Sequence, residues 1–104
     1  MANSDKRRQL RIKATGPITI VRASGEQVEG QAIDVSLLGC RLSSATLLEL
    51  EEQIVTTLRF PSGRSHEVSG TIKSIQPPSP YQYGVAFSPE TVEQIIKDFF
   101  QEEG

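Results

Sequence analysis

Residues 54–75, IVTTLRFPSGRSHEVSGTIKSI, decide the fold class of this chain. Residues 54–60 alternate between two faces, with Ile54, Thr56, Leu58 and Phe60 on one of them, which is the two-residue period of a β-strand with one buried face. Pro61-Ser62-Gly63 has the composition of a turn, and a second strand-like segment follows over residues 66–75. We therefore predict that the two segments pair as an antiparallel hairpin.

Further strand-like segments lie on both sides of this hairpin. They cover residues 18–21, 28–35, 40–42 and 81–87. Clusters of Gly, Pro and Ser separate most of them, which indicates turns. Six short strands joined by turns are typical of an antiparallel barrel or sandwich. Residues 45–53 fit either one helical turn or a loop.

The last predicted element is a helix over residues 89–102. Ser88 is a suitable N-cap, and Pro89 suits the first helical position. Apolar side chains then form one stripe at helical spacing: Val92, Ile95, Ile96, Phe99 and Phe100. Such a stripe has to be buried, so we expect the helix to cover an open end or seam of the strands. A dimer or partner surface is the alternative.

Composition excludes several classes of protein. The chain has 104 residues, of which 37% are hydrophobic and 23% charged, as expected for one globular domain. No apolar run is long enough to span a membrane, and no apolar stretch follows the charged N-terminus as in a secretory signal. A single Cys and a single His cannot form the usual zinc ligand set. We expect a cytoplasmic protein without a metal or cofactor.

Charge is distributed unevenly along the chain. Residues 1–22 hold six basic side chains and one acidic one, a net charge of +5, whereas the remaining residues sum to −7. A cationic segment on an acidic body indicates a local site for an anion. It argues against a nucleic-acid surface, which is normally basic over a whole face. We predict a flexible N-terminal arm over residues 1–14, which binds the anion. A solvated, disordered tail is the alternative.

Catalytic motifs are missing. Asp34, Ser36 and His66 are the residue types of a hydrolase triad, but the sequence lacks Gly-x-Ser-x-Gly. It also lacks a glycine-rich phosphate loop. We therefore predict that the protein is not an enzyme.

The arm carries the first binding motif, Arg7-Arg8-Gln9-Leu10-Arg11. A guanidinium binds phosphate through two parallel hydrogen bonds, and its flat face stacks on a purine. Arginines four residues apart on an extended arm can grip one anion from two sides. We name Arg7, Arg8 and Arg11 as candidate ligand-binding residues.

The second binding motif is Asp34-Val35-Ser36-Leu37-Leu38-Gly39. At strand spacing, Asp34 and Ser36 share a face, and a carboxylate there can accept two hydrogen bonds from the N1–H and N2–H edge of guanine. Gly39 permits a turn with positive φ and close approach of a ligand. Alternatively, Asp34 and Ser36 only stabilise the turn through local hydrogen bonds.

Together these motifs resemble the PilZ domain family, bacterial receptor modules for cyclic di-GMP. Arg7-x-x-x-Arg11 and Asp34-x-Ser36-x-x-Gly39 match the two family motifs, and residues 83–87, YGVAF, resemble the final strand. The resemblance implies one domain: an arm over residues 1–14, a six-stranded antiparallel barrel over 15–88 and a helix over 89–102.

The resemblance also implies roles for the motif residues. Arg7 and Arg11 would grip phosphates and guanine faces, and the Asp34 motif would read a guanine edge. The residue before the first motif, here Lys6, influences in this family whether one ligand or an intercalated pair binds. The chain has no Trp to pack on the ligand, so a Tyr or an aliphatic side chain would have to replace it.

The predicted function is therefore that of a cyclic di-GMP receptor. Ligand binding would order the arm, and the domain would signal in trans to a partner protein in motility, exopolysaccharide or pilus machinery. We expect a monomer or homodimer, with no nucleic acid bound and no membrane insertion. A nucleotide-independent PilZ-type adaptor and a small RNA-binding β-barrel are the alternatives.

Overall fold

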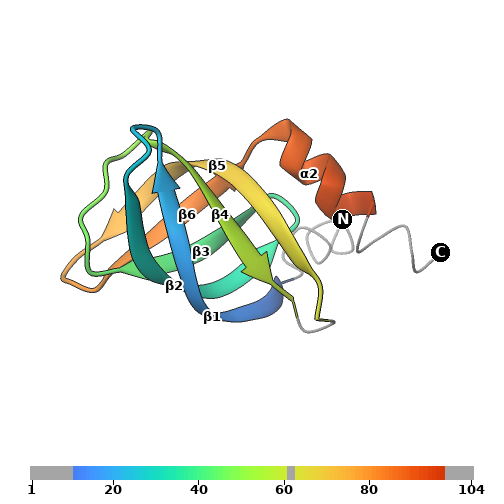
Figure 1. Ribbon diagram of the computed structural model, residues 1–104, viewed down its shortest axis with the longest axis horizontal. Coiled ribbons are helices and arrows are strands. Elements are labelled where there is room, and N and C mark those ends of the chain that lie inside the picture. The colour runs from blue at the N-terminus through green and yellow to red at the C-terminus, as the bar shows by residue number, and fades with distance from the viewer. Residues whose placement is uncertain (1–10, 61–62, 98–104) are drawn as a thin grey trace, which may run out of the picture.

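The computed structural model describes residues 11–60 and 63–97, with the backbone alone for residues 11–15. The elements are β1 (Arg11–Arg22), β2 (Gln27–Ser36), β3 (Gly39–Ser44), β4 (Gln53–Arg59), β5 (Ser65–Gln76), β6 (Tyr81–Phe87) and α2 (Pro89–Ile95). Figure 1 shows the strands wrapping around a common axis, with α2 at one end.

The strands form a closed barrel in the order β1-β2-β3-β6-β5-β4, and every neighbouring pair is antiparallel. The β4–β5 hairpin runs from Gln53↔Thr71 to Arg59↔Ser65. The β1–β4 ladder that closes the barrel extends only from Ile20↔Thr56 to Arg22↔Ile54. The predicted hairpin and six-stranded antiparallel barrel are both confirmed.

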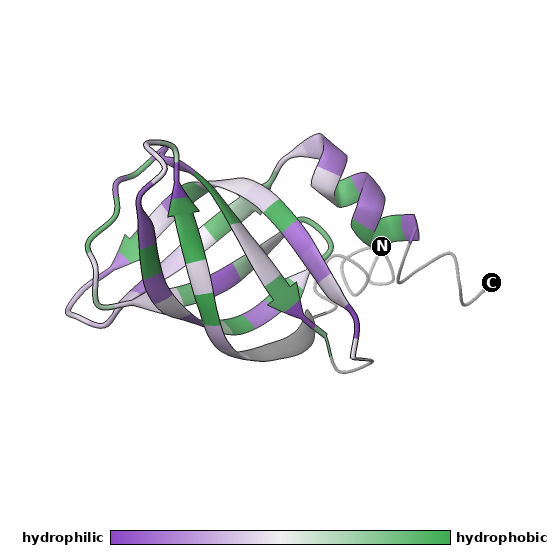
Figure 2. Cartoon of the chain, viewed as in Figure 1, coloured by the Kyte–Doolittle hydropathy of each residue, from purple (hydrophilic) through white to green (hydrophobic). Residues whose placement is uncertain are grey.

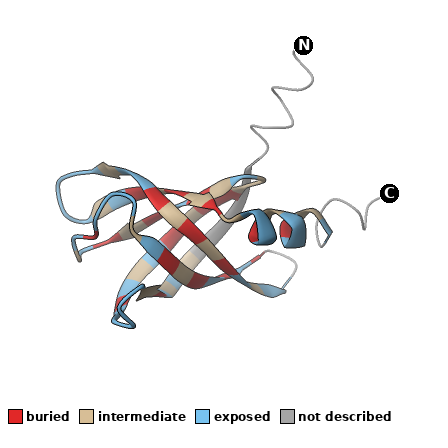
Figure 3. Cartoon of the chain, turned by 90° about the horizontal axis from the view of Figure 1, so that it is seen from above, coloured by how far each residue is buried: buried red, intermediate tan, exposed pale blue. Residues whose placement is uncertain are grey.

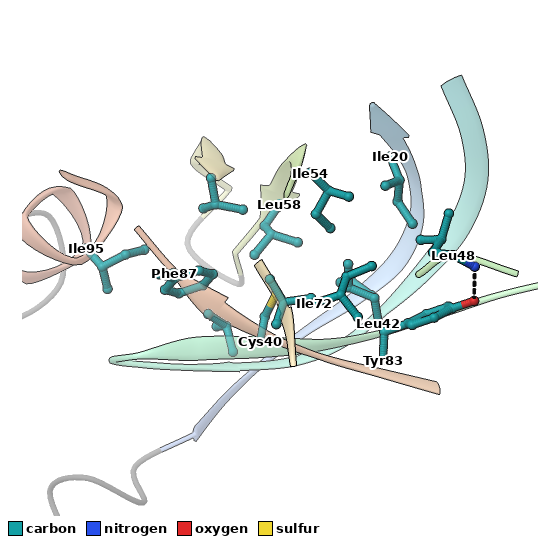
Figure 4. Close-up of a cluster of buried hydrophobic side chains, with 14 of the residues drawn as sticks. Ile20, Cys40, Leu42, Leu48, Ile54, Leu58, Ile72, Tyr83, Phe87 and Ile95 are labelled. Atoms are coloured by element: carbon teal, nitrogen blue, oxygen red, sulfur yellow. Dashed lines mark hydrogen bonds between the residues drawn. The ribbon is translucent and has the colours of Figure 1, made fainter. Parts of the chain in front are cut away.

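The inward-facing side chains of the strands form one core. In β4, Ile54, Thr56 and Leu58 are buried, whereas the positions between them are half-buried or exposed. Figures 2 and 3 show the same alternation of hydropathy and burial along the barrel strands. Buried side chains from all six strands meet in the interior, as Figure 4 shows in close-up.

The segment between β3 and β4 is a loop, which settles the open alternative for residues 45–53. It closes one end of the barrel by placing the fully buried Leu48 in the core. The Tyr83 hydroxyl accepts a hydrogen bond from the Leu48 amide at 2.8 Å (Figure 4). It donates one to the Thr46 carbonyl at 2.7 Å. Arg22 also contacts Glu52 of this loop, at 2.6 Å.

Tyr83→Phe is expected to destabilise the barrel by about 1–3 kcal/mol, because the buried Leu48 amide would lose its acceptor. Chemical denaturation monitored by circular dichroism measures this change. Tyr81→Phe, the same change at a half-buried tyrosine of β6, is the control and should cost about 0.5 kcal/mol or less. Equal losses in the two variants would show that the Tyr83 hydroxyl has no special role.

Strand β1 begins at Arg11, although alternation in the sequence starts only after Pro17. Residues 11–14, assigned by sequence to the arm, therefore belong to the barrel, and residues 1–10 lie outside the described residues. A register shift lies between Lys13 and Gly16, and Gly16 has a φ of 137°. This irregularity interrupts the two-residue period, while main-chain pairing with β2 continues beyond it.

Helix α2 begins as its sequence predicts. The Ser88 hydroxyl accepts a hydrogen bond from the Thr91 amide, and Pro89 occupies the first turn. Ile95 is buried in the core cluster and Val92 packs against it, so the helix covers the barrel end near Phe87 (Figure 4). Residues 98–102 of the predicted helix lie outside the described residues. No helix in the described part of the chain is long and apolar enough to cross a membrane.

Candidate functional site

The β2–β3 hairpin carries the second predicted motif. Asp34 and Ser36 lie at the end of β2, next to the turn. Leu37 and Leu38 form the turn, and Gly39 begins β3. The Ser36 hydroxyl donates a hydrogen bond to the Gly39 carbonyl at 3.2 Å. The hydroxyl therefore has a structural role in the turn, as the local alternative expected.

The start of β1 lies directly beside this hairpin. In the β1–β2 ladder, Arg11 is the Cα partner of Ser36, and Lys13 is the Cα partner of Asp34. The barrel thus brings the backbone of the last arginine of the first motif next to the second motif. Arg7 and Arg8 lie outside the described residues.

Asp34 lies on the outer face of the barrel, beside the Arg41 side chain, because β2 contains one residue more than β3 at this point. Ala32 pairs with Leu42, whereas Asp34 pairs with Arg41, so Ile33 is a bulge between them. Beyond the bulge the inward positions are Val35 and its partner Cys40, both buried in the core. Without the bulge, the Asp34 side chain would point into the barrel, as the side chains of Val28 and Ala32 do.

Arg41 holds the Asp34 carboxylate. Its Nη2 donates to Asp34 Oδ2 at 2.6 Å, and its Nε lies 3.2 Å from Oδ2 and 3.3 Å from Oδ1. The Asp34 side chain is only 10% exposed, whereas that of Arg41 is 51% exposed. This hydrogen-bonded carboxylate raises the pKa of the Arg41 guanidinium.

Arg41 lies outside both sequence motifs and was not predicted to belong to the site. The length of the turn could have predicted the contact between Asp34 and Arg41. A two-residue loop at Leu37-Leu38 pairs position 35 with 40 and position 34 with 41. Opposite charges at directly paired positions of a hairpin attract each other. An explicit register for the turn would therefore have predicted the Asp34–Arg41 contact.

Gly39 is required for a reason other than the predicted one. Among the described glycines, positive φ occurs at Gly16, Gly25 and Gly63, not at Gly39. Instead, a Cβ at Gly39 would collide with the backbone carbonyl oxygen of Val85 on β6. The glycine lets β3 and β6 approach each other, so the expectation of a left-handed turn residue was wrong.

A family model described as PilZ domain matches residues 5–102, which contain both motifs and the whole barrel. This chain belongs to the PilZ domain family. No curated protein sequence matches it.

Solved structures of other proteins share the fold of this PilZ domain. The PilZ domain of YcgR from Escherichia coli, solved with c-di-GMP, has a TM-score of 0.64 at 16% identity, over 90% of this chain and 88% of the other. The PilZ domain of CeSA from a cellulose-synthesizing bacterium has a TM-score of 0.64 at 19% identity, over 92% and 100%. Apo MrkH from K. pneumonia has a TM-score of 0.57 at 17% identity, over 91% of this chain and 51% of MrkH.

Neither tyrosine of this PilZ domain lies beside the Asp34 motif. Tyr83 is buried inside the barrel, and Tyr81 pairs with Ser44, at the opposite end of β3 from Gly39. The exposed large apolar side chain in the motif is Leu38, at 55% exposure. An aliphatic contact with a ligand therefore fits the described site better than a tyrosine does.

The residue types of a hydrolase triad do not come together in this PilZ domain. Asp34 and Ser36 are on β2, whereas His66 is on β5, which is not a neighbour of β2 in the barrel. The His66 ring packs edge-on against Phe60, with 5.5 Å between ring centroids. Burial raises the pKa of the Cys40 thiol to about 12, so this thiol is not an activated nucleophile. Among the described residues, no cluster of His, Cys, Asp or Glu could hold a metal ion.

Proposed function

We propose that this PilZ domain is a cytoplasmic receptor for cyclic di-GMP. The observation that carries the proposal is the pairing of Arg11 with Ser36, which brings the backbone of the last arginine of the first motif beside the second motif. Family membership over residues 5–102 supports it, as does the structure of the E. coli YcgR PilZ domain with c-di-GMP.

The residues of the two motifs supply complementary chemistry for this ligand. Cyclic di-GMP presents two phosphates and two guanines. Arg7, Arg8 and Arg11 would bind phosphate oxygens and stack on guanine faces. The Asp34 carboxylate would accept the N1–H and N2–H donors of one guanine, next to Ser36 and Gly39.

Signal transfer would follow from the position of the arginines relative to the barrel. Arg11 begins β1, whereas Arg7 and Arg8 precede it. A ligand held by both motifs would draw the segment with Arg7 and Arg8 onto the barrel. The ligand shifts the protein towards this state only by its greater affinity for it. The new surface would then bind a partner protein of motility, exopolysaccharide or pilus machinery.

Isothermal titration of the protein with cyclic di-GMP, cyclic di-AMP and GTP tests this function. Saturable binding of cyclic di-GMP, with at least tenfold weaker binding of the other nucleotides, is expected. Binding of none of them would refute the receptor and favour a nucleotide-independent adaptor. Binding of RNA that falls steeply with salt would instead favour the RNA-binding alternative.

A further inference from the structure

Arg41 forms an ion pair with Asp34 at the candidate site, although Arg41 belongs to neither sequence motif. We propose that Arg41 is a positioning residue, which holds the Asp34 carboxylate in the orientation that reads the guanine edge. This inference rests on the proposed function and assigns to Arg41 a part in its specificity.

The contacts of Arg41 fix the orientation of the Asp34 carboxylate. Arg41 makes its short contact with Oδ2, at 2.6 Å, and only a long one with Oδ1, at 3.3 Å. Because Nε contacts both oxygens and Nη2 contacts Oδ2, the guanidinium restricts rotation of the Asp34 carboxylate.

Burial makes this support necessary. The Asp34 side chain is 10% exposed, and a buried carboxylate needs compensating donors. Arg41 reaches it from β3, across a directly paired position. A carboxylate held in one rotamer loses less conformational entropy on binding than a mobile one, so the net free energy of ligand binding is more favourable.

On β6, the strand on the opposite side of β3 from Asp34, the residue paired with Arg41 has no side chain. Arg41 pairs with Gly84 on β6, and a Cβ at Gly84 would meet the Ser74 hydroxyl of β5. Gly84 therefore contributes no group that could draw the guanidinium away from Asp34. Arg41 remains 51% exposed, so a ligand on this face can reach the pair.

The test compares Arg41→Gln with the wild-type protein by calorimetric titration. We expect about tenfold weaker binding of cyclic di-GMP, equivalent to about 1.4 kcal/mol. With cyclic di-IMP, whose bases lack the 2-amino donor, the loss should be about threefold or less. Arg41→Lys keeps the charge without the planar fork and should restore only part of the affinity.

Two controls separate positioning from other effects. Lys73→Gln removes the same charge from a 54% exposed side chain that is paired with Glu51, and should leave binding unchanged. In the Asp34→Ala background, Arg41→Gln should have little further effect, because coupled residues give non-additive losses. Thermal unfolding of each variant checks the fold, and Arg41→Lys carries the comparison if Arg41→Gln does not fold.

Each result decides between distinct conclusions. Unchanged or tighter binding by Arg41→Gln would overturn the inference while leaving the receptor function intact. Equal losses with cyclic di-GMP and cyclic di-IMP would also overturn it, because Arg41 would then not act through the guanine edge. Failure of the wild-type protein to bind cyclic di-GMP would reject the proposed function, and with it this role of Arg41.

Discussion

The Arg7→Ala/Arg11→Ala double variant is expected to lose measurable cyclic di-GMP binding while keeping the barrel intact. Each charge-assisted hydrogen bond from a guanidinium contributes about 1.5–3 kcal/mol. Either single substitution should therefore weaken binding about 10- to 150-fold. Calorimetric titration measures the affinity, and circular dichroism with thermal unfolding measures the fold.

The control for the double variant removes two positive charges elsewhere. Arg59 is exposed on β4, and Lys73 is exposed on β5. Arg59→Ala/Lys73→Ala should bind cyclic di-GMP within about threefold of wild type, because neither residue belongs to the binding motifs and the effect of exposed charges is weakened by salt. If both double variants lost affinity equally, overall charge rather than the arginine motif would account for binding.

Asp34→Ala is expected to weaken cyclic di-GMP binding about 100-fold and to remove the preference over cyclic di-AMP. The variant lacks the acceptor for two guanine donors, and each such bond to a charged group is worth about 1.5–3 kcal/mol. Adenine presents an acceptor nitrogen at the same edge, which the carboxylate repels. Competition titrations with the two cyclic dinucleotides measure the selectivity directly.

Stability should change little in this variant. Removing Asp34 leaves Arg41 without this carboxylate, but its side chain is 51% exposed and can be hydrated. Glu67→Ala, at an exposed acidic residue of β5, is the control for lost negative charge. An Asp34→Ala protein that still preferred cyclic di-GMP over cyclic di-AMP would contradict the assigned role of Asp34.

Much of the barrel could be predicted from local sequence. The alternation in residues 54–60 and the turn after it predict the β4–β5 hairpin, because the period of side chains along a strand depends only on backbone geometry. The start of α2 was predictable for a similar reason, since Ser88 caps amides within its own first turn. The motif residues themselves were recognisable by residue type and spacing.

The start of β1 was not predictable in the same way. Residues 11–14 show no clear alternation, yet their backbone pairs with the end of β2. That pairing depends on main-chain hydrogen bonds to a distant segment, which a local pattern does not report. It is also what brings Arg11 next to Ser36.

Sequence by itself determined most of the strand segments, apart from the start of β1, and which residue types are available for a phosphate and a guanine. Only the tertiary structure decided on which face of β2 the Asp34 side chain lies and which residue it pairs with. The bulge at Ile33 turns this carboxylate out of the core, and the β2–β3 register supplies Arg41 as its partner. The physical reason is that orientation and ion pairing depend on the register between strands, which is set by the packing of the whole barrel.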